Sequence, residues 1–289
     1  MATSEALAME RLGAGDVAAG LALSDAVGWN QTAADWAYFI IEGEAFGMRD
    51  QAGRIVATAA ALPYQGGFGW VSMVLVDADH RHGGIATRLL AACIAALRRA
   101  GRVPVLDATP AGAEVYRRSG FISGFTFDRW ERPAAGAEHG GVPRSDAGDR
   151  PIEARRGADV NDIVALDSAA QRVGRAALLR GFLARAGTHA WLAAPRDGFV
   201  IARTGRRATQ VGPVVAARTA DALTLVEKAL AARPGRIFID VPARATTLVR
   251  WLEQRGFAPQ RSFVRMALGD NALLAADLRM FALAGPEYG

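Results

Sequence analysis

Hydrophobic residues along the chain follow two spacings: alternation, which is typical of half-buried strands, and recurrence every three or four positions, which is typical of amphipathic helices. In the first half these spacings predict two helices, a hairpin, and then strands and helices in alternation. The predicted elements are a helix from about residue 16, a short helix capped near 32, a hairpin with its turn at 50–53, strands over 69–76, 103–108 and 122–130, and helices over 84–100 and through 116. An antiparallel start that leads into a βαβ unit predicts an α/β (α+β mixed) fold class, with a mixed, mostly antiparallel sheet flanked by helices.

The second half of the chain repeats this order after a shorter and less regular opening. Three sequence matches occur in the same order in both halves, which indicates a tandem duplication. The matched pairs are Glu10–Val17 with Glu153–Val160, Gly101–Phe121 with Gly235–Phe257, and Arg129 with Arg265, each arginine following the glycine of a Gly-Phe pair by nine residues.

The stretch Arg132–Pro151 between the two copies is rich in proline, glycine and small polar residues. It has no apolar periodicity, so it is predicted to be a linker. The predicted organisation is a first domain over 1–131, a linker over 132–150 and a second domain over 151–289.

Composition favours a globular protein that is neither secreted nor embedded in a membrane. Of its 289 residues, 51% are hydrophobic and 22% are charged, and no apolar run reaches the roughly 18 residues of a membrane span. The acidic start lacks a signal-peptide pattern, and Cys93 is the one cysteine, so a cytoplasmic location is expected. The 34 basic residues exceed the 29 acidic ones, but they are scattered arginines apart from Lys228, so no nucleic-acid partner is predicted.

The segment Val74–Leu90 begins as a strand and ends as a helix, with a basic, glycine-rich corner between. A helix that starts there presents free backbone N–H groups, and Gly83 and Gly84 let a ligand approach them closely. Arg81 adds a positive charge, so the corner suits a phosphate or pyrophosphate. The alternative is a tight turn whose glycines only relieve strain. No G-x-x-x-x-G-K-[ST] loop occurs, and Gly13–Ala18, which fits G-x-G-x-x-A, follows no strand.

Two motifs give the chain a resemblance to a known family. Arg81–Ala86, "RHGGIA", fits the R/Q-x-x-G-x-G/A signature between strand and helix, and Val115–Phe121, "VYRRSGF", places a tyrosine four residues before a Gly-Phe pair. In both motifs the chain resembles the GCN5-related N-acetyltransferase (GNAT) superfamily, and its duplication resembles the tandem members. The resemblance implies two GNAT-like domains and transfer of an acetyl group from acetyl-CoA to an amine of a small molecule, by direct attack in a ternary complex.

The resemblance also implies which residues hold acetyl-CoA. The pyrophosphate would lie on the signature loop and the pantetheine arm along the preceding strand, where the backbone N–H of Leu75 or Val76 would stabilise the oxyanion. The implied cofactor-binding residues are Met73, Val74, Leu75, Val76, Arg81, His82, Gly83, Gly84, Ile85, Ala86 and Thr87. A non-catalytic acyl-CoA sensor or regulatory module would use the same corner, and a dinucleotide-binding Rossmann protein would need a different glycine pattern.

Acyl transfer needs an unprotonated nucleophile, an oxyanion donor and a proton for the departing thiolate. Tyr116 is the candidate acid, because a phenol with a pKa of about 10 is protonated at neutral pH. Asp107 is the first candidate base and Glu44 the second, and a water relay would need neither. His80, His82 and their neighbouring aspartates stand too close in sequence to converge on an ion, so no metal is predicted.

The acceptor site is expected in the helical segment "GWNQTAADW", with Trp29, Asn30, Asp35 and Trp36 forming a flat apolar wall with an amide and a carboxylate. The alternative places both tryptophans in the core. The second half lacks the signature around Val211–Val215 and has Leu252 where the first half has Tyr116, so it is expected to be a degenerate copy that completes the acceptor pocket and stabilises the first half. The protein is expected to be a monomer or a homodimer.

Overall fold

The fold comes from a computed structural model, which describes residues 7–134, 152–155, 160–194, 196–269 and 277–289. The chain forms two compact units, Met1–Pro104 and Val105–Gly289. Most of the predicted linker, 135–150, lies outside the described residues. No helix within the described ranges has the length and apolar content needed to cross a bilayer.

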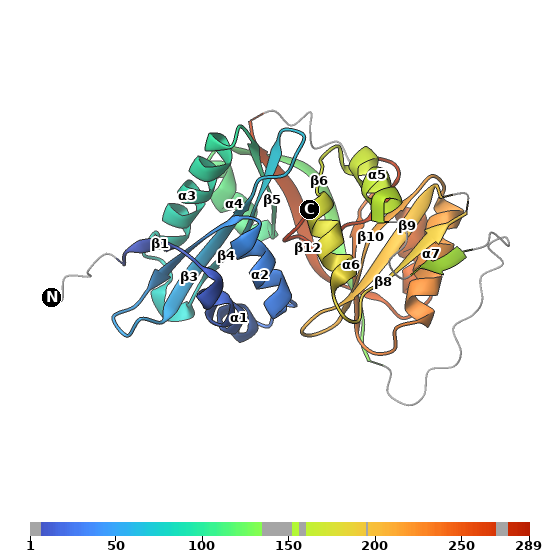
Figure 1. Ribbon diagram of the computed structural model, residues 1–289, viewed down its shortest axis with the longest axis horizontal. Helices are drawn as coiled ribbons and strands as arrows, with labels where there is room; N and C mark the ends of the chain where they lie inside the picture. The colour runs from blue at the N-terminus through green and yellow to red at the C-terminus, as the bar shows by residue number, and fades with distance from the viewer. Residues whose placement is uncertain (1–6, 135–151, 156–159, 195, 270–276) are drawn as a thin grey trace. The chain divides into compact units, whose positions relative to one another are not determined.

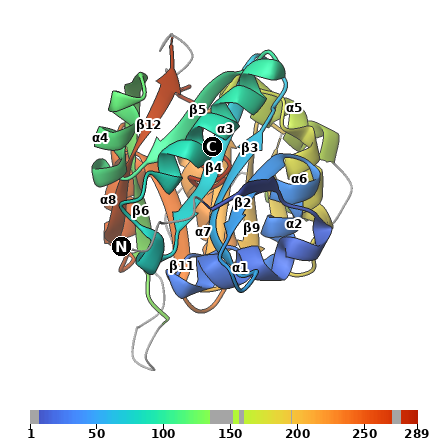
Figure 2. The ribbon, with the colours of Figure 1, turned by 90° about the vertical axis from the view of Figure 1, so that its left-hand side faces the viewer.

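The first unit is an antiparallel sheet with helices on both faces. Its strands are β1 (Met9–Arg11), β2 (Glu44–Arg49), β3 (Ile55–Leu62) and β4 (Phe68–Val76), with η1 (Ala14–Asp16), η2 (Ala78–His80), α1 (Val17–Ala26), α2 (Ala33–Ile41) and α3 (Ile85–Arg99). Each strand pairs with the next along the chain. Figure 1 shows α3 on one face of these strands and α1 and α2 on the other, and Figure 2 looks onto α3 in front of β4.

Local sequence signals explain several boundaries in this unit. The side chain of Thr32 accepts a hydrogen bond from the Asp35 amide, and the Asp35 carboxylate accepts one from the Thr32 amide, so a capping box starts α2. The predicted hairpin turn is confirmed, since the Gly53 amide donates to the Asp50 carbonyl at 2.9 Å. The sequence did not predict β1, because its three residues are mostly exposed and carry no alternation.

The second unit holds the remaining elements. They are β5 (Val103–Ala108, which begins in the first unit), α4 (Pro110–Arg118), β6 (Phe121–Arg132), β7 (Ile152–Arg155), α5 (Val160–Gln171), α6 (Ala176–Ala184), β8 (His189–Ala193), β9 (Gly198–Thr204), β10 (Thr209–Ala216), α7 (Thr219–Ala231), β11 (Ile237–Pro242), α8 (Thr246–Glu253), β12 (Ala258–Leu268) and β13 (Met280–Ala282). The strand order is β5-β12-β6-β11-β10-β9-β8-β7, with β13 beside β10.

The two sequence repeats exchange their last long strands within this unit. β6 ends the first repeat but pairs with β11 of the second, and β12 ends the second repeat but pairs with β5 of the first. β6 and β12 also pair with each other, and Figure 1 shows them side by side. The compact units therefore differ from the sequence repeats, because β5, α4 and β6 pack with the second half of the chain.

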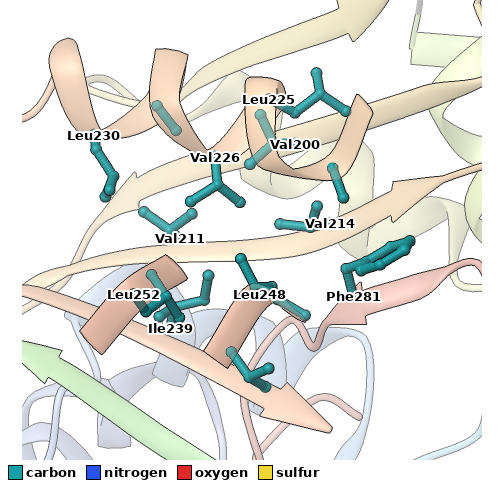
Figure 3. Packing of buried hydrophobic residues seen from close by; sticks show 14 of the residues in the cluster. Val200, Val211, Val214, Leu225, Val226, Leu230, Ile239, Leu248, Leu252 and Phe281 are labelled. Atoms are coloured by element: carbon teal, nitrogen blue, oxygen red, sulfur yellow. The ribbon is translucent and has the colours of Figure 1, made fainter. Parts of the chain in front are cut away.

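The main core of the second unit lies between the sheet and helices α7 and α8. Figure 3 shows Val226 of α7 pointing toward Val211 of β10, and Leu225 and Val214 belong to the same cluster. Burial of these branched side chains on one helix face is what the apolar periodicity of the sequence predicts. Phe281 of β13 joins the same cluster, so the last described part of the chain belongs to this core.

Candidate functional site

The segment between β4 and α3 forms an exposed corner. The short turn η2 follows β4, His82 adopts a left-handed conformation with φ 66°, and Gly84, with φ 74°, is the N-cap of α3. A left-handed residue other than glycine costs roughly 1–2 kcal/mol, so the strain at His82 must be offset by its surroundings. Strained backbone of this kind clusters at functional sites.

The two glycines leave the helix end open. A Cβ atom on Gly83 would lie 4.0 Å from the nearest atom, the His80 carbonyl oxygen, and one on Gly84 would meet nothing within 4 Å. The Arg88 amide donates to the Gly84 carbonyl at 3.1 Å, so the amides before Arg88 precede the helical hydrogen-bond ladder. The first turn of α3 contains no acidic residue. Exposed amides at the positive end of a 15-residue helix suit an anion.

Arg81 joins this corner to the end of β4. Its Nε donates to the Val76 carbonyl oxygen at 3.1 Å, and the residue is exposed. This hydrogen bond holds the guanidinium at the end of β4, where it adds positive charge to the corner. Among the described residues, no three His, Cys, Asp or Glu side chains gather as a metal site.

β4 is irregular just before this corner. Met73 has φ 53°, and the β3–β4 register shifts between Thr58 and Ala60. The fully buried Thr58 donates its hydroxyl to the Met73 carbonyl at 2.9 Å, which holds the irregularity in place. Of the cofactor residues implied on this strand, Met73 and Leu75 are buried, whereas Val74 and Val76 are half-buried. Two of the four left-handed residues other than glycine in the described chain, Met73 and His82, thus fall in the candidate site.

The four residues expected to form an acceptor wall have different environments. Trp29 is half-buried and Asn30 is 8% exposed, in the loop between α1 and α2. Asp35 is engaged in the capping box of α2, and Trp36 is fully buried, with its Nε1 donating to Ser24 at 3.0 Å. Because a side chain without exposed surface cannot touch an acceptor, we leave Trp36 out of the acceptor wall, and we leave Asp35 out because Thr32 already engages its carboxylate.

Gln31, which the sequence reasoning missed, lies in the same loop. Its side chain is buried, and its Oε1 has no hydrogen-bond partner among the described residues. A buried amide oxygen without a partner is costly, and it accepts from any N–H group that reaches it. No sequence signal could have singled it out, because a glutamine in a loop is common.

Tyr116, the candidate acid, lies in the last turn of α4. Thr109 caps this helix, and Gly112, one turn before the tyrosine, leaves room for the ring, since a Cβ there would lie 3.4 Å from Tyr116 Cε2. The half-buried ring packs edge-on against Phe121 with centroids 5.9 Å apart. Leu252 stands at the matching position of α8 and is fully buried in the core.

Asp107, the first candidate base, is held by an arginine of the other repeat. Arg265 Nε and Nη2 each donate to a carboxylate oxygen of Asp107 at 2.9 Å, and the Asp107 side chain has no exposed surface. Burial raises the pKa of the Asp107 carboxyl, and the Arg265 guanidinium opposes that rise. A carboxylate enclosed in a two-pronged ion pair is not available to an incoming amine, so we do not assign it as a base.

Two further residues with reactive side chains, Glu44 and Cys93, are accounted for by their surroundings. Glu44, the second candidate base, accepts a hydrogen bond from Arg99 at 3.2 Å. Cys93 is fully buried in α3, and burial raises the pKa of its thiol, so it is a core residue and not a nucleophile.

The repeated aspartate and arginine form a second, equivalent ion pair. Arg129 Nε and Nη2 donate to the two carboxylate oxygens of Asp240, each at 2.8 Å. Gln210 adds a third donor to Asp240 at 2.8 Å. The recurrence of these residues was visible in the sequence, but the exchange of partners between repeats was not.

The corresponding corner of the second repeat is short and closed. Only residues 217–218 separate β10 from α7, whereas residues 77–84 separate β4 from α3. Asp221 lies in the first turn of α7, is 4% exposed, and is bound by Arg218 through two hydrogen bonds of 2.9 and 2.8 Å. The first turn of α7 thus carries a carboxylate bound by Arg218, whereas the first turn of α3 carries no acidic residue.

Two segments of the chain match family models with one and the same description, "Acetyltransferase (GNAT) domain". The first match covers residues 35–123 and the second covers residues 163–282. Each match falls within one of the sequence repeats, so the duplication inferred from the residues corresponds to two copies of one kind of domain.

Individual proteins are similar over most of the chain. The "Uncharacterized N-acetyltransferase YitH" of Bacillus subtilis (strain 168) is 24% identical over 220 residues, which cover 75% of each chain. A provisionally assigned acetyltransferase of Pyrococcus horikoshii has a TM-score of 0.80 at 16% identity, covering 99% of this chain and 96% of that one. The tandem GNAT protein of the clavulanic acid biosynthesis pathway has a TM-score of 0.65 at 18% identity, covering 91% and 99%. At these identities the two solved structures show a shared fold.

Proposed function

Because the chain belongs to the GNAT acetyltransferase family and carries two such domains in tandem, we propose that its first repeat transfers an acetyl group from acetyl-CoA to an amine of a small molecule. The observation that carries this proposal is the open corner at Arg81–Gly84, where both glycines face free space. An anion of pyrophosphate size needs such unhindered backbone amides.

The chain's own residues would bind acetyl-CoA in two places. The amides from Gly83 to Thr87 and the Arg81 guanidinium would hold the pyrophosphate, because they combine a helix dipole with a fixed charge. The backbone of β4 around Met73 would pair with the amides of the pantetheine arm, as an added strand pairs with its neighbour. The strain at Met73 supports this role, since its position departs from ordinary strand geometry.

The acceptor would bind beside the loop between α1 and α2. Trp29 offers an apolar surface, and the amide of Asn30 offers hydrogen bonds. An amine-bearing small molecule matches this combination.

The reaction would be a direct attack within the ternary complex. The unprotonated amine forms a C–N bond with the thioester carbonyl carbon, the C–S bond breaks, and the thiolate of CoA leaves. Tyr116 would give its phenolic proton to this thiolate, and the proton lost by the amine would pass to water, because Asp107 and Glu44 are both engaged by arginines.

A non-catalytic acyl-CoA sensor is the alternative that the same corner supports. The two functions differ in turnover, because a sensor would bind acetyl-CoA without releasing free thiol when amines are added. Steady thiol release with at least one member of an amine panel therefore supports the enzyme, and binding without release supports the sensor.

The corner itself is tested by Gly83→Glu, which places a negative charge beside the amides. Gly83 is preferable to Gly84, whose φ of 74° would strain any side chain. We expect the affinity for CoA in calorimetry to fall about tenfold or more, which corresponds to about 1.4 kcal/mol. Gly15→Glu is the matched control, because Gly15 is exposed, has open space around it and lies outside the corner. Equal affinities of the two variants would contradict the proposed site.

A further inference from the structure

In the second repeat, β10 and β11 separate and a third strand fills the gap between them. The two strands are parallel partners from Thr209–Ile237 to Val211–Ile239. Beyond Val211 this pairing ends, and β13 takes its place, antiparallel to β10 at Val214 and Val215. β13 is therefore a wedge inserted where two strands diverge.

Both sides of the gap bind this wedge. On one side the Ala216 amide donates to the Arg279 carbonyl at 2.9 Å, and on the other the Leu283 amide donates to the Asp240 carbonyl at 2.9 Å. Met280 to Ala284 are all buried, and Figure 3 shows Phe281 beside Val214. A Cβ atom on Gly212 would lie 2.0 Å from the Leu283 carbonyl oxygen, so this glycine is needed for the close approach of the segment.

The segment continues from β13 to helix α6. Tyr288 is fully buried and packs edge-on against Phe182 of α6, with centroids 5.1 Å apart. The Arg203 guanidinium lies 4.3 Å from the Phe182 ring centroid and 5.5 Å from that of Tyr288, and it donates to Glu287 at 3.3 Å. Met280–Tyr288 is thus bound along its length by strands and by a helix of the same repeat.

The place of β13 matches the place proposed for acetyl-CoA in the first repeat. β10 precedes α7 as β4 precedes α3, and each strand has a register shift, around Gly212 in β10 and around Met73 in β4. A pantetheine arm carries two amides joined by methylene groups, so a peptide strand offers the same N–H and C=O groups to a sheet. The Asp221 carboxylate at the start of α7 likewise stands where a phosphate would bind in the first repeat.

We infer that Met280–Tyr288, together with the Asp221 carboxylate, is a built-in ligand of the second repeat, which occupies the groove of an acyl-CoA and closes it. The identity of the groove rests on the function proposed for the first repeat. The chain supplies both parts of the missing ligand, peptide amides for the pantetheine arm and a carboxylate for the phosphate. The second repeat consequently binds no CoA, and one CoA binds per chain.

Hydrogen exchange of the full chain, followed by mass spectrometry with and without acetyl-CoA at about 1 mM, the upper end of common substrate KM values, tests this inference. We expect peptides covering 280–289 to be equally protected in both conditions and peptides covering 81–88 to become protected with acetyl-CoA. Loss of protection at 280–289 on adding acetyl-CoA would overturn the inference, because it would make the segment a displaceable gate. Exchange of 280–289 as fast as an unstructured peptide would overturn it as well. Absence of protection at 81–88 would instead contradict the function proposed for the first repeat.

Gly212→Ala tests the fit of the segment without changing the segment itself. We expect exchange at 280–289 to accelerate by about tenfold or more, while the stoichiometry stays at one CoA per chain. Gly235→Ala is the matched control, since Gly235 also has a positive φ, 95°, but open space around it. Tyr288→Ala gives a second readout that leaves β10 intact and is expected to accelerate exchange in the same peptides. Unchanged protection in both Gly212→Ala and Tyr288→Ala would overturn the inference.

Discussion

The two repeats differ at the junction between one strand and the helix that follows it, β4 and α3 in the first repeat and β10 and α7 in the second. In the first repeat, an eight-residue corner, 77–84, leaves the amides of α3 exposed, and strain is kept at Met73 and His82. In the second, a two-residue turn leads into α7, the first turn of α7 carries the buried Asp221, and β13 fills the gap beside β10. On the inference drawn above, the second copy has done more than lose motif residues. The chain's own polar groups in β13 satisfy the backbone groups of β10 and β11 that a ligand would otherwise satisfy.

The largest effect is expected where the repeats share a feature, the two buried ion pairs. Arg265→Met leaves Asp107 buried without a partner and should lower the free energy of unfolding by about 3–5 kcal/mol. Arg129→Met should cost less, because Gln210 still donates to Asp240. Urea denaturation followed by tryptophan fluorescence measures both. The double variant Asp107→Leu with Arg265→Met should regain most of the loss, and a double variant as unstable as Arg265→Met alone would contradict this account.

The next effect concerns turnover, because Tyr116 of the first repeat can donate a proton and Leu252 at the matching position of the second repeat cannot. Tyr116→Phe keeps the ring and removes the proton, so turnover should fall by about 100-fold while CoA affinity stays within about twofold. The matched change in the other repeat, Leu252→Met, conserves volume in a buried position and should leave turnover unchanged. Steady-state thiol release measures both variants. Equal turnover of Tyr116→Phe and the unmodified protein would contradict the role of Tyr116 as an acid and leave it a packing residue.

A smaller effect tests whether the irregular part of β4 serves ligand binding. Thr58→Val removes the hydroxyl that holds the Met73 carbonyl, and such a hydrogen bond contributes about 1 kcal/mol. CoA affinity measured by calorimetry should therefore fall about fivefold. Thr224→Val removes a similar hydroxyl-to-carbonyl bond from α7 in the second repeat and should not change the affinity. If both variants bind CoA alike, Thr58 stabilises the fold without shaping the site.

The smallest effect concerns the ion pair of Asp277 and Arg279, which directly precedes the built-in segment Met280–Tyr288. Hydrogen bonds from the Arg279 side chain lower the pKa of Asp277 to about 2, below the value of about 3.9 for an unperturbed aspartate. Asp277 therefore stabilises the fold above about pH 4, and this contribution disappears as the pH falls toward 2. Because the pair lies near the surface, the contribution should be below about 1 kcal/mol. The difference in thermal midpoint between the protein and Asp277→Asn should shrink over this window, and a difference that does not vary with pH would contradict the assignment.

Local signals predicted most elements and the corner, because their causes lie within a few residues. The cap at Thr32, the turn at Asp50 and the glycines at the start of α3 each determine their own surroundings. The role of Asp107 could not be predicted in this way. The alternation of apolar and polar residues in this strand does not show whether the arginine that binds Asp107 belongs to its own repeat or to the other. Only the pairing of β12 with β5 places Arg265 of the second repeat opposite Asp107.

The built-in segment was missed for a related reason. β13 is three residues long, and its partners lie far away in the sequence, so neither periodicity nor a turn signal marks it. The place of Trp36 could not be predicted either. An aromatic residue in this segment is compatible with the wall of a binding site and with the hydrophobic core. Its contact with Gly20, where a Cβ would lie 2.4 Å from the ring, is a feature of packing that the sequence does not reveal.

The exchange of strands between repeats also determines when the protein can finish folding during its synthesis. Asp107 and Arg265 are 158 residues apart, and Arg129 and Asp240 are 111 residues apart. At the usual rate of translation, β12 is synthesised on the order of ten seconds after β5, and only then can the two strands pair. During that interval the nascent chain carries an unpaired sheet edge, which is a template for aggregation. The nascent protein therefore has an incomplete sheet, which chaperones can bind, until β11 and β12 have been synthesised. The pairing of β11 with β6 and of β12 with β5 then completes both repeats at a late stage of synthesis.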